Sequence, residues 1–237
     1  MTEHAFPELF EEPLSLALDR RGRAGEPAPP GPPLEGRVLL GGPLSVPVTP
    51  EYVAEDRDMA LFVEQEAARA VYHVVHLAVT MATEPVSPRL DHVQIDLELS
   101  TSAGAGGNGG EPPLAWSMAP LKVTEETEIG TTFKLGPQLR IAQVQGSLGE
   151  VSRTRTGRRT VPLLEATGEL SPEPRWVLRG TKGVPLSGSQ RLVVVIRVPV
   201  GSRTRVVTSV RAAVVKGSIL RKYVRQLPEP LSLSTVV

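Results

Sequence analysis

Two histidines are the first residues in this chain whose type and spacing suggest chemistry. His73 and His76 stand three positions apart, and imidazoles are common metal ligands. The same spacing puts both imidazoles on one face of a helix but on opposite faces of a strand. The surrounding residues are apolar and β-branched, which predicts a strand. We therefore expect no joint metal site at these two histidines.

Two groups of carboxylates are the next candidates. The first lacks the residue order of a calcium-binding helix–loop–helix motif, and it fits a solvated helix start, where acidic side chains are stabilised. The second precedes a predicted strand and fits a solvated turn, with calcium held by loop carboxylates as the alternative. The first group is Glu55, Asp56 and Asp58, and the second is Glu125, Glu126 and Glu128.

Other catalytic signatures are missing from the sequence. It contains no phosphate-binding glycine loop that opens a helix, no G-x-S-x-G elbow and no H-E-x-x-H zinc motif. It also contains no cysteine, which excludes disulfides, thiol nucleophiles and cysteine-bound metals. The sequence thus predicts a protein that is not an enzyme and has no cofactor. A metal-dependent enzyme using loop carboxylates is the least favoured alternative.

Basic side chains form the largest set of candidate interaction residues. Four arginines flank Gly157 in a run typical of an exposed hairpin tip, and six basic residues lie in or just after the last long predicted strand. If they converge, they form a patch able to bind nucleic acid or acidic lipid. The other possibilities are a solvated outer face or self-association with the acidic half of the chain. The set comprises Arg153, Arg155, Arg158, Arg159, Arg203, Arg205, Arg211, Arg221, Lys222 and Arg225.

The net charge of zero hides two oppositely charged parts. Residues 1–100 carry 17 acidic and 7 basic side chains, a net charge of −10, and residues 101–237 carry 9 acidic and 19 basic ones, a net charge of +10. A polarity of this size predicts interaction, either with a foreign partner or between copies of the chain.

Short strands must position these residues. Residues 91–99 alternate most clearly, with Val93, Ile95 and Leu97 on one face and Asp96 and Glu98 on the other. Trp116 and Trp176 are expected to fill the core, and residues 218–226 are expected to form a basic helical turn. Eight to ten short strands separated by glycine and proline turns favour an antiparallel β-sandwich. The other expected strands are 72–81, 114–118, 129–135, 138–144, 150–155, 163–170, 175–179, 192–198 and 203–215.

Composition divides the chain into four parts. Residues 1–50 form an acidic arm or linker, and the proline density of residues 20–50 argues against a continuous helix or a central strand there. Residues 51–69 form a short helix, residues 70–226 the β-sandwich with a flexible glycine-rich loop at 103–110, and residues 227–237 a tail. The pentapeptide EPLSL occurs in the arm and again in the tail, a weak sign of paired docking motifs.

These patterns lead to one functional expectation and its alternatives. The chain has no cationic start followed by a long apolar run and no apolar window long enough to span a membrane, so a cytoplasmic location is expected. We expect a non-catalytic binding or assembly module whose acidic and basic halves mediate self-association or contact with a protein partner. An anionic-surface binder, for nucleic acid or acidic lipid, is the alternative.

Overall fold

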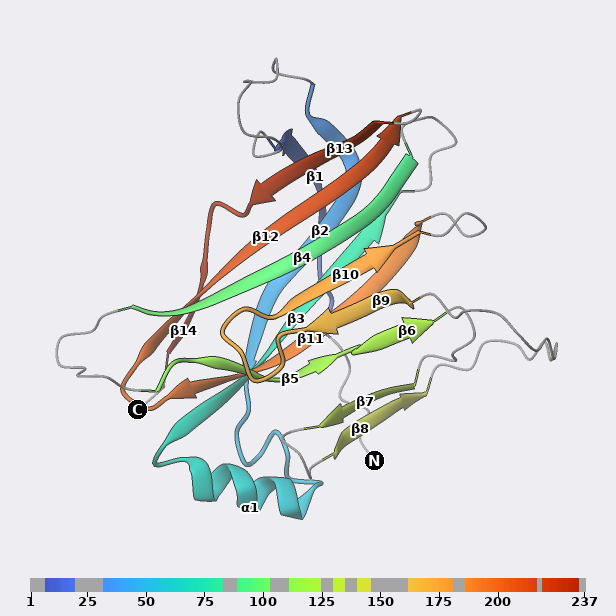
Figure 1. The fold of residues 1–237 in the computed structure, drawn as a ribbon. Helices are drawn as coiled ribbons and strands as arrows, with labels where there is room; N and C mark the ends of the chain where they lie inside the picture. The colour runs from blue at the N-terminus through green and yellow to red at the C-terminus, as the bar shows by residue number, and fades with distance from the viewer. Residues whose placement is uncertain are drawn as a thin grey trace.

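Antiparallel strands make up most of this protein, as its alternating sequence predicts. The computed structural model describes residues 7–19, 32–82, 89–102, 111–124, 130–134, 140–145, 162–180, 186–216 and 219–234. Within these residues the chain forms fourteen strands and one helix, and twelve of the strands belong to a single sheet that folds into two layers (Figure 1). The predicted mainly β, antiparallel fold with one helix is confirmed.

The first layer, which we call the helix layer, holds the most apolar strands. β3 and β11 pair along their whole length, from Ala70 opposite Pro199 to Met81 opposite Gly188. Both strands are buried on both faces over most of this length, as expected of central strands. In spatial order the layer contains β5 (Leu114–Ala119), β11 (Gly188–Pro199), β3 (Ala70–Met81), β2 (Leu34–Pro47) and β1 (Glu11–Leu18).

The second layer, which we call the groove layer, alternates between core and solvent. β4 and β12 form its centre and pair from Arg203 opposite Ser102 to Val215 opposite Arg89. A short strand, β14 (Leu231–Ser234), lies beside the first residues of β12. In spatial order the layer contains β13 (Ile219–Gln226), β12 (Arg203–Lys216), β4 (Arg89–Ser102), β10 (Arg175–Arg179), β9 (Pro162–Thr167) and β6 (Lys122–Thr124). β7 (Gly130–Lys134) and β8 (Arg140–Gln145) form a separate two-stranded sheet.

Two junctions join the layers into a nearly closed barrel. On one side β1 passes from β2 to β13 and pairs with it through Ala17 and Leu18. On the other side the chain runs directly from β5 into β6, and the Ala166 amide donates to the Leu121 carbonyl at 2.8 Å. The predicted sandwich is corrected to a nearly closed barrel, because hydrogen bonding continues around these corners and two open-edged sheets do not result.

The core lies between the two layers. Trp176, which is 0% exposed, is the largest side chain in a cluster of Val, Leu and Ile residues from both layers. A second, smaller cluster lies on the outer side of the helix layer, where Trp116 is only partly buried. The expectation that both tryptophans fill the core therefore holds for Trp176 and is wrong for Trp116.

The helix covers this second cluster. α1 (Arg57–Glu66) lies within the range predicted for a helix and packs Met59 and Val63 against the outer face of the helix layer. Asp56 caps it by accepting a hydrogen bond from the Met59 amide at 3.0 Å. The first acidic group therefore marks a helix start, as its position predicts.

The proline-rich segment contains two strands, which its composition argued against. β2 is a central strand of the helix layer, so the expectation of no such strand in residues 20–50 is wrong. Pro13 and Pro43 both lie where the strand register shifts, and at such irregularities a missing amide donor breaks no ladder bond. Gly42, between the shifted residues, has a φ of +83°, and a Cβ there would lie 2.6 Å from the His76 carbonyl oxygen.

The C-terminal segment also differs from its prediction. Residues 219–226 form strand β13 where a helical turn was expected, because their alternating side chains pair with the length of β12 from Ser209 to Lys216. The two EPLSL segments lie partly or wholly in β1 and β14, and in both the leucines point to the core while the serine is exposed. Their repetition therefore reflects two strands of one barrel that alternate between core and solvent in the same way, and docking motifs are not needed to explain it.

Some expectations fall outside the described residues. They are the flexible loop at 103–110, the strand at 150–155 and the second acidic group, Glu125, Glu126 and Glu128. The division of the chain at residues 50, 69 and 226 stays a prediction.

Candidate functional site

The outer face of the groove layer carries a row of polar side chains across four neighbouring strands. Arg175 on β10 lies opposite Asp96 on β4, Asp96 lies opposite Ser209 on β12, and Ser209 lies opposite Gln226 on β13. Residues directly opposite each other in antiparallel strands present their side chains on the same face. The alternation of β4 therefore brings residues from both charged halves of the chain together on this face.

Asp96 is the fixed centre of this row. Its Oδ1 lies 3.7 Å from Arg175 Nε, its Oδ2 lies 3.5 Å from Arg211 Nε, and Gln94 Nε2 donates a hydrogen bond to Oδ1 at 2.6 Å. The Asp96 side chain is 16% exposed, whereas those of Arg175 and Arg211 are 44% and 53% exposed. Two cations held by one half-buried carboxylate form a charge network, which keeps its geometry better than an isolated surface pair.

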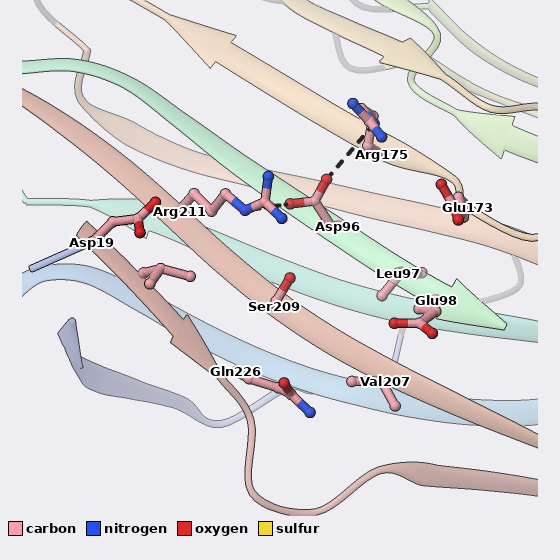
Figure 2. Close-up of a pocket in the computed structure, with 11 residues that line it drawn as sticks. Asp19, Asp96, Leu97, Glu98, Glu173, Arg175, Val207, Ser209, Arg211 and Gln226 are labelled. Carbon is pink, nitrogen blue, oxygen red and sulfur yellow. Dashed lines mark ion pairs between the residues drawn. The ribbon is translucent and has the colours of Figure 1, made fainter. Parts of the chain in front are cut away.

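A groove of about 580 Å³ surrounds this network (Figure 2). Its lining contains four carboxylates but only two guanidinium groups, so it is acidic overall. Figure 2 shows Glu98 and Glu173 toward one end of the groove and Asp19 toward the other. The lining residues are Asp19, Asp96, Leu97, Glu98, Glu173, Arg175, Val207, Ser209, Arg211, Val224 and Gln226.

Glu98 and Glu173 differ from Asp96 in their pairing. Within the part of the chain that the structure describes, neither side chain forms a hydrogen bond or an ion pair. Both are exposed at the groove, where a positively charged group of a ligand can approach them. The arrangement thus offers acceptors for a cation beside a row of arginine donors.

The predicted basic residues separate into three sets. Arg203, Arg205 and Arg211 are exposed on one face of β12, and Lys222 lies on that same face of the layer, opposite Ala213. Arg221 and Arg225 project from the other side of β13, where Arg225 Nη1 donates to the Ser15 carbonyl at 3.4 Å. The remaining four, Arg153, Arg155, Arg158 and Arg159, lie outside the described residues.

A second charged cluster lies at the opposite layer, between α1 and the sheet. Arg197 on β11 has a side chain only 11% exposed, and its guanidinium contacts Glu111 at 2.5 Å and Glu66 at 4.0 Å. Beside it, burial raises the pKa of Tyr72 to about 12. Burial also acts to lower the pKa of Arg197, but Glu111 and Tyr72 together raise it above its usual value, so the guanidinium stays charged.

Three aromatic rings close this cluster. Phe62 of α1 stacks on Trp116 with ring centroids 6.3 Å apart, and Tyr72 meets the edge of Trp116 at 5.7 Å. The rings contact one another, which makes this a packed joint between α1, β3 and β5. We assign it a structural role and no ligand.

The two histidines lie on opposite faces of β3, as predicted. His73 faces the core side and lies 3.2 Å from Ser45 Oγ, while His76 lies on the outer face opposite Val193. Burial lowers the pKa of both imidazoles, and Arg191 lowers that of His76 further. Among the residues that the structure describes, no group of three or more His, Asp or Glu side chains is placed to hold a metal ion.

Comparison with known proteins finds distant likenesses only. No family model and no curated protein matches this chain. It is similar to a solved chain titled "Pore forming protein", at 8% identity and a TM-score of 0.36, over 83% of each chain. It is also similar to Clostridium perfringens delta-toxin, at 9% identity and a TM-score of 0.33 over 83% of this chain and 82% of that one. A third is the Clostridium perfringens NetB toxin in its membrane inserted form, at 7% identity and a TM-score of 0.28 over 94% of each chain.

These findings correct the function expected from the sequence. The titles of the similar structures contradict a cytoplasmic binding or assembly module, so that prediction is not retained, nor are the cytoplasmic location and the self-association through oppositely charged halves. All three TM-scores lie below 0.5, and the likeness itself assigns no function. The described part of the chain contains no helix long and apolar enough to cross a membrane.

The fold gives a physical reason for the correction of self-association. Asp96 belongs to the acidic half, and its partners Arg175 and Arg211 belong to the basic half. Glu66 and Arg197 join the halves in the same way at the other layer. Opposite charges on the described residues thus meet within one chain, and no second copy is needed to pair them.

Sequence reasoning missed most of the groove. The alternation of residues 91–99 placed Asp96 and Glu98 on the wet face correctly, yet it gave no sign of what lies across from them. Arg175 was expected only as the start of a strand, and Glu173 lies between two expected strands and was not assigned to any site. The register between β4 and β10 would have revealed them. It pairs residues about 80 positions apart in the sequence, and local patterns carry no information about such distant pairs.

Proposed function

We propose that the groove of the groove layer is a binding site for a basic segment of a protein partner. The observation that carries the proposal is the difference between the groove carboxylates. Asp96 is neutralised by two arginines, whereas Glu98 and Glu173 line the same groove and make no ion pair among the described residues. Unpaired carboxylates beside a fixed row of arginines favour a ligand that brings its own cations.

The charge of the groove separates this partner from the anionic ones. Four carboxylates line it against two guanidinium groups that already contact Asp96. A nucleic acid or an acidic lipid would bring phosphates against Glu98 and Glu173, a like-charge contact that costs binding energy. Arg203 and Arg205, exposed further along β12, remain candidates for contacts with acidic side chains of the same partner.

A peptide titration tests the proposal. The probe is a short fluorescent peptide of alternating lysine and glycine, followed by fluorescence anisotropy at about 50 mM salt and again at higher salt. We expect saturable binding that weakens with salt, and in the double variant Glu98→Gln with Glu173→Gln an affinity at least about tenfold lower, equivalent to roughly 1.4 kcal/mol.

The matched control removes two exposed carboxylates elsewhere. Glu35→Gln with Glu64→Gln changes the net charge equally, but these residues lie on β2 and α1. Its affinity should equal that of the unmodified chain. The proposal is wrong if the peptide does not bind saturably, or if both double variants lose the same affinity.

A further inference from the structure

One side of the barrel is closed without a backbone ladder. β1 pairs with β2 only as far as Glu11 opposite Gly41, and the rest of β2 pairs on its other side with β3. β14 pairs with β12 through four residue pairs. Within the described residues no backbone pairing joins β14 to β2, so a seam runs between these two strands.

The imidazole of His73 lies in this seam. It projects from β3 on the core side, is 6% exposed, and its Nδ1 lies 3.2 Å from Ser45 Oγ on β2. On the other side the Ser234 main chain of β14 lies beside the imidazole, whose Nε2 is buried and makes no hydrogen bond among the described residues. Next to Ser234, the Leu233 side chain is 1% exposed and packs in the core. One buried side chain thus packs between two strands that backbone hydrogen bonds leave unjoined.

We propose that His73 is an acid-operated clasp, and that its protonation opens the seam and releases β14 from the barrel. A charged imidazole in this buried position has to regain water, and the four-residue β14 is the element beside it with the fewest contacts to lose. Release would expose Leu231 and Leu233 together with the edges of β2 and β12.

None of the groups that face His73 carries a negative charge that could stabilise its protonated imidazole. β2 presents Ser45, β11 presents Ile196, and β14 presents the Ser234 main chain; of the charged neighbours in sequence, Arg197 projects from the opposite face of β11. No described charged side chain acts on the imidazole. Burial is the main cause that lowers the His73 pKa from 6.5, and the Ser234 main chain partly opposes it.

The sign of the pH effect follows. In the closed barrel His73 stays neutral, whereas in the released state its pKa returns toward 6.5 and it takes up a proton. The clasp is therefore fully closed above that pH and weakens as the pH falls below it. This inference does not depend on the groove, which lies on the outer face of the other layer.

Amide hydrogen exchange of the full chain tests it, with rates corrected for the intrinsic effect of pH. Between about pH 7.5 and pH 5 we expect protection of residues 231–234 to fall at least about tenfold, while residues 93–99 of β4 stay protected. In His73→Asn, and in the second neutral replacement His73→Gln, protection of β14 should no longer depend on pH.

His76→Asn is the control, because burial lowers the pKa of His76 as well but its imidazole lies on the outer face, away from β14. This variant should keep the loss of protection seen in the unmodified chain. The proposal is overturned if β14 protection does not fall in acid, if it falls equally in both His73 variants, or if β4 opens together with β14.

Discussion

Asp96 and Tyr72 show at the scale of single residues how position decides chemistry in this protein. The Asp96 carboxylate is held at the edge of the groove by contacts with two arginines and a hydrogen bond from Gln94. Tyr72, 1% exposed, has the opposite surroundings, since burial favours its uncharged form. The first residue therefore organises a binding surface, and the second stabilises a packed joint.

The raised pKa of Tyr72 makes a prediction for alkaline solution. The unfolded phenol ionises near pH 10 and the folded one near pH 12, so the unfolded state loses its proton first and stability falls as the pH rises between these values. Urea unfolding between about pH 9 and pH 12 should show a loss of about 2 kcal/mol that Tyr72→Phe does not show. An equal loss in both proteins would contradict this assignment.

At the scale of elements, α1 is fastened to the sheet by a buried cation and by aromatic packing. Arg197 contacts Glu66 of α1 and Glu111 before β5, while Phe62 of α1 packs on Trp116 and Tyr72. Arg69 contacts the same Glu66 carboxylate at 3.8 Å, but its side chain is 76% exposed. Burial is therefore the main difference between the two ion pairs that share Glu66.

We expect the different burial of Arg197 and Arg69 to give different losses in the free energy of unfolding when each arginine is replaced. Arg197→Leu should lose about 2 kcal/mol, because it removes charge-assisted contacts from a nearly buried site. Arg69→Leu should lose less than about 0.5 kcal/mol, the range of exposed pairs. Urea denaturation of the two variants measures both values. Similar losses in the two variants would show that burial does not make the ion pairs of Arg197 more stabilising than that of Arg69.

The elements also show which parts of the fold the sequence could reveal. Alternation identified β4 and β12, and a continuous apolar run identified β11. Both patterns are local, because whether a strand is buried on one face or on both determines which of its own residues are apolar. β2 was missed because its prolines lie where they break no ladder hydrogen bond. Pro43 lies at the register shift, and Pro47 lies in the part of β2 that β1 does not reach, and neither position can be known from the local sequence. β13 was missed because its pairing with β12 outweighs local preference.

At the scale of the whole molecule, the two charged halves are interleaved. Strand order places β4 of the acidic half between β12 and β10 of the basic half, so the opposite charges meet across one sheet. The linear sequence showed the size of the polarity, with −10 and +10, but could not show that the chain pairs part of it internally. What remains among the residues that line the groove is a local excess of carboxylates, which is the basis of the proposed binding function.

Chemical-shift mapping with the lysine and glycine peptide is the most direct test of that function, because it reports where the partner binds as well as whether it does. In amide spectra of the full chain, we expect the peptide to shift the resonances of Leu97, Glu98, Val207 and Ser209, which line the groove. Resonances of β3 and α1 should stay unchanged. Shifts confined to other faces of the barrel, or none at a peptide concentration that saturates the anisotropy signal, would contradict the proposed site.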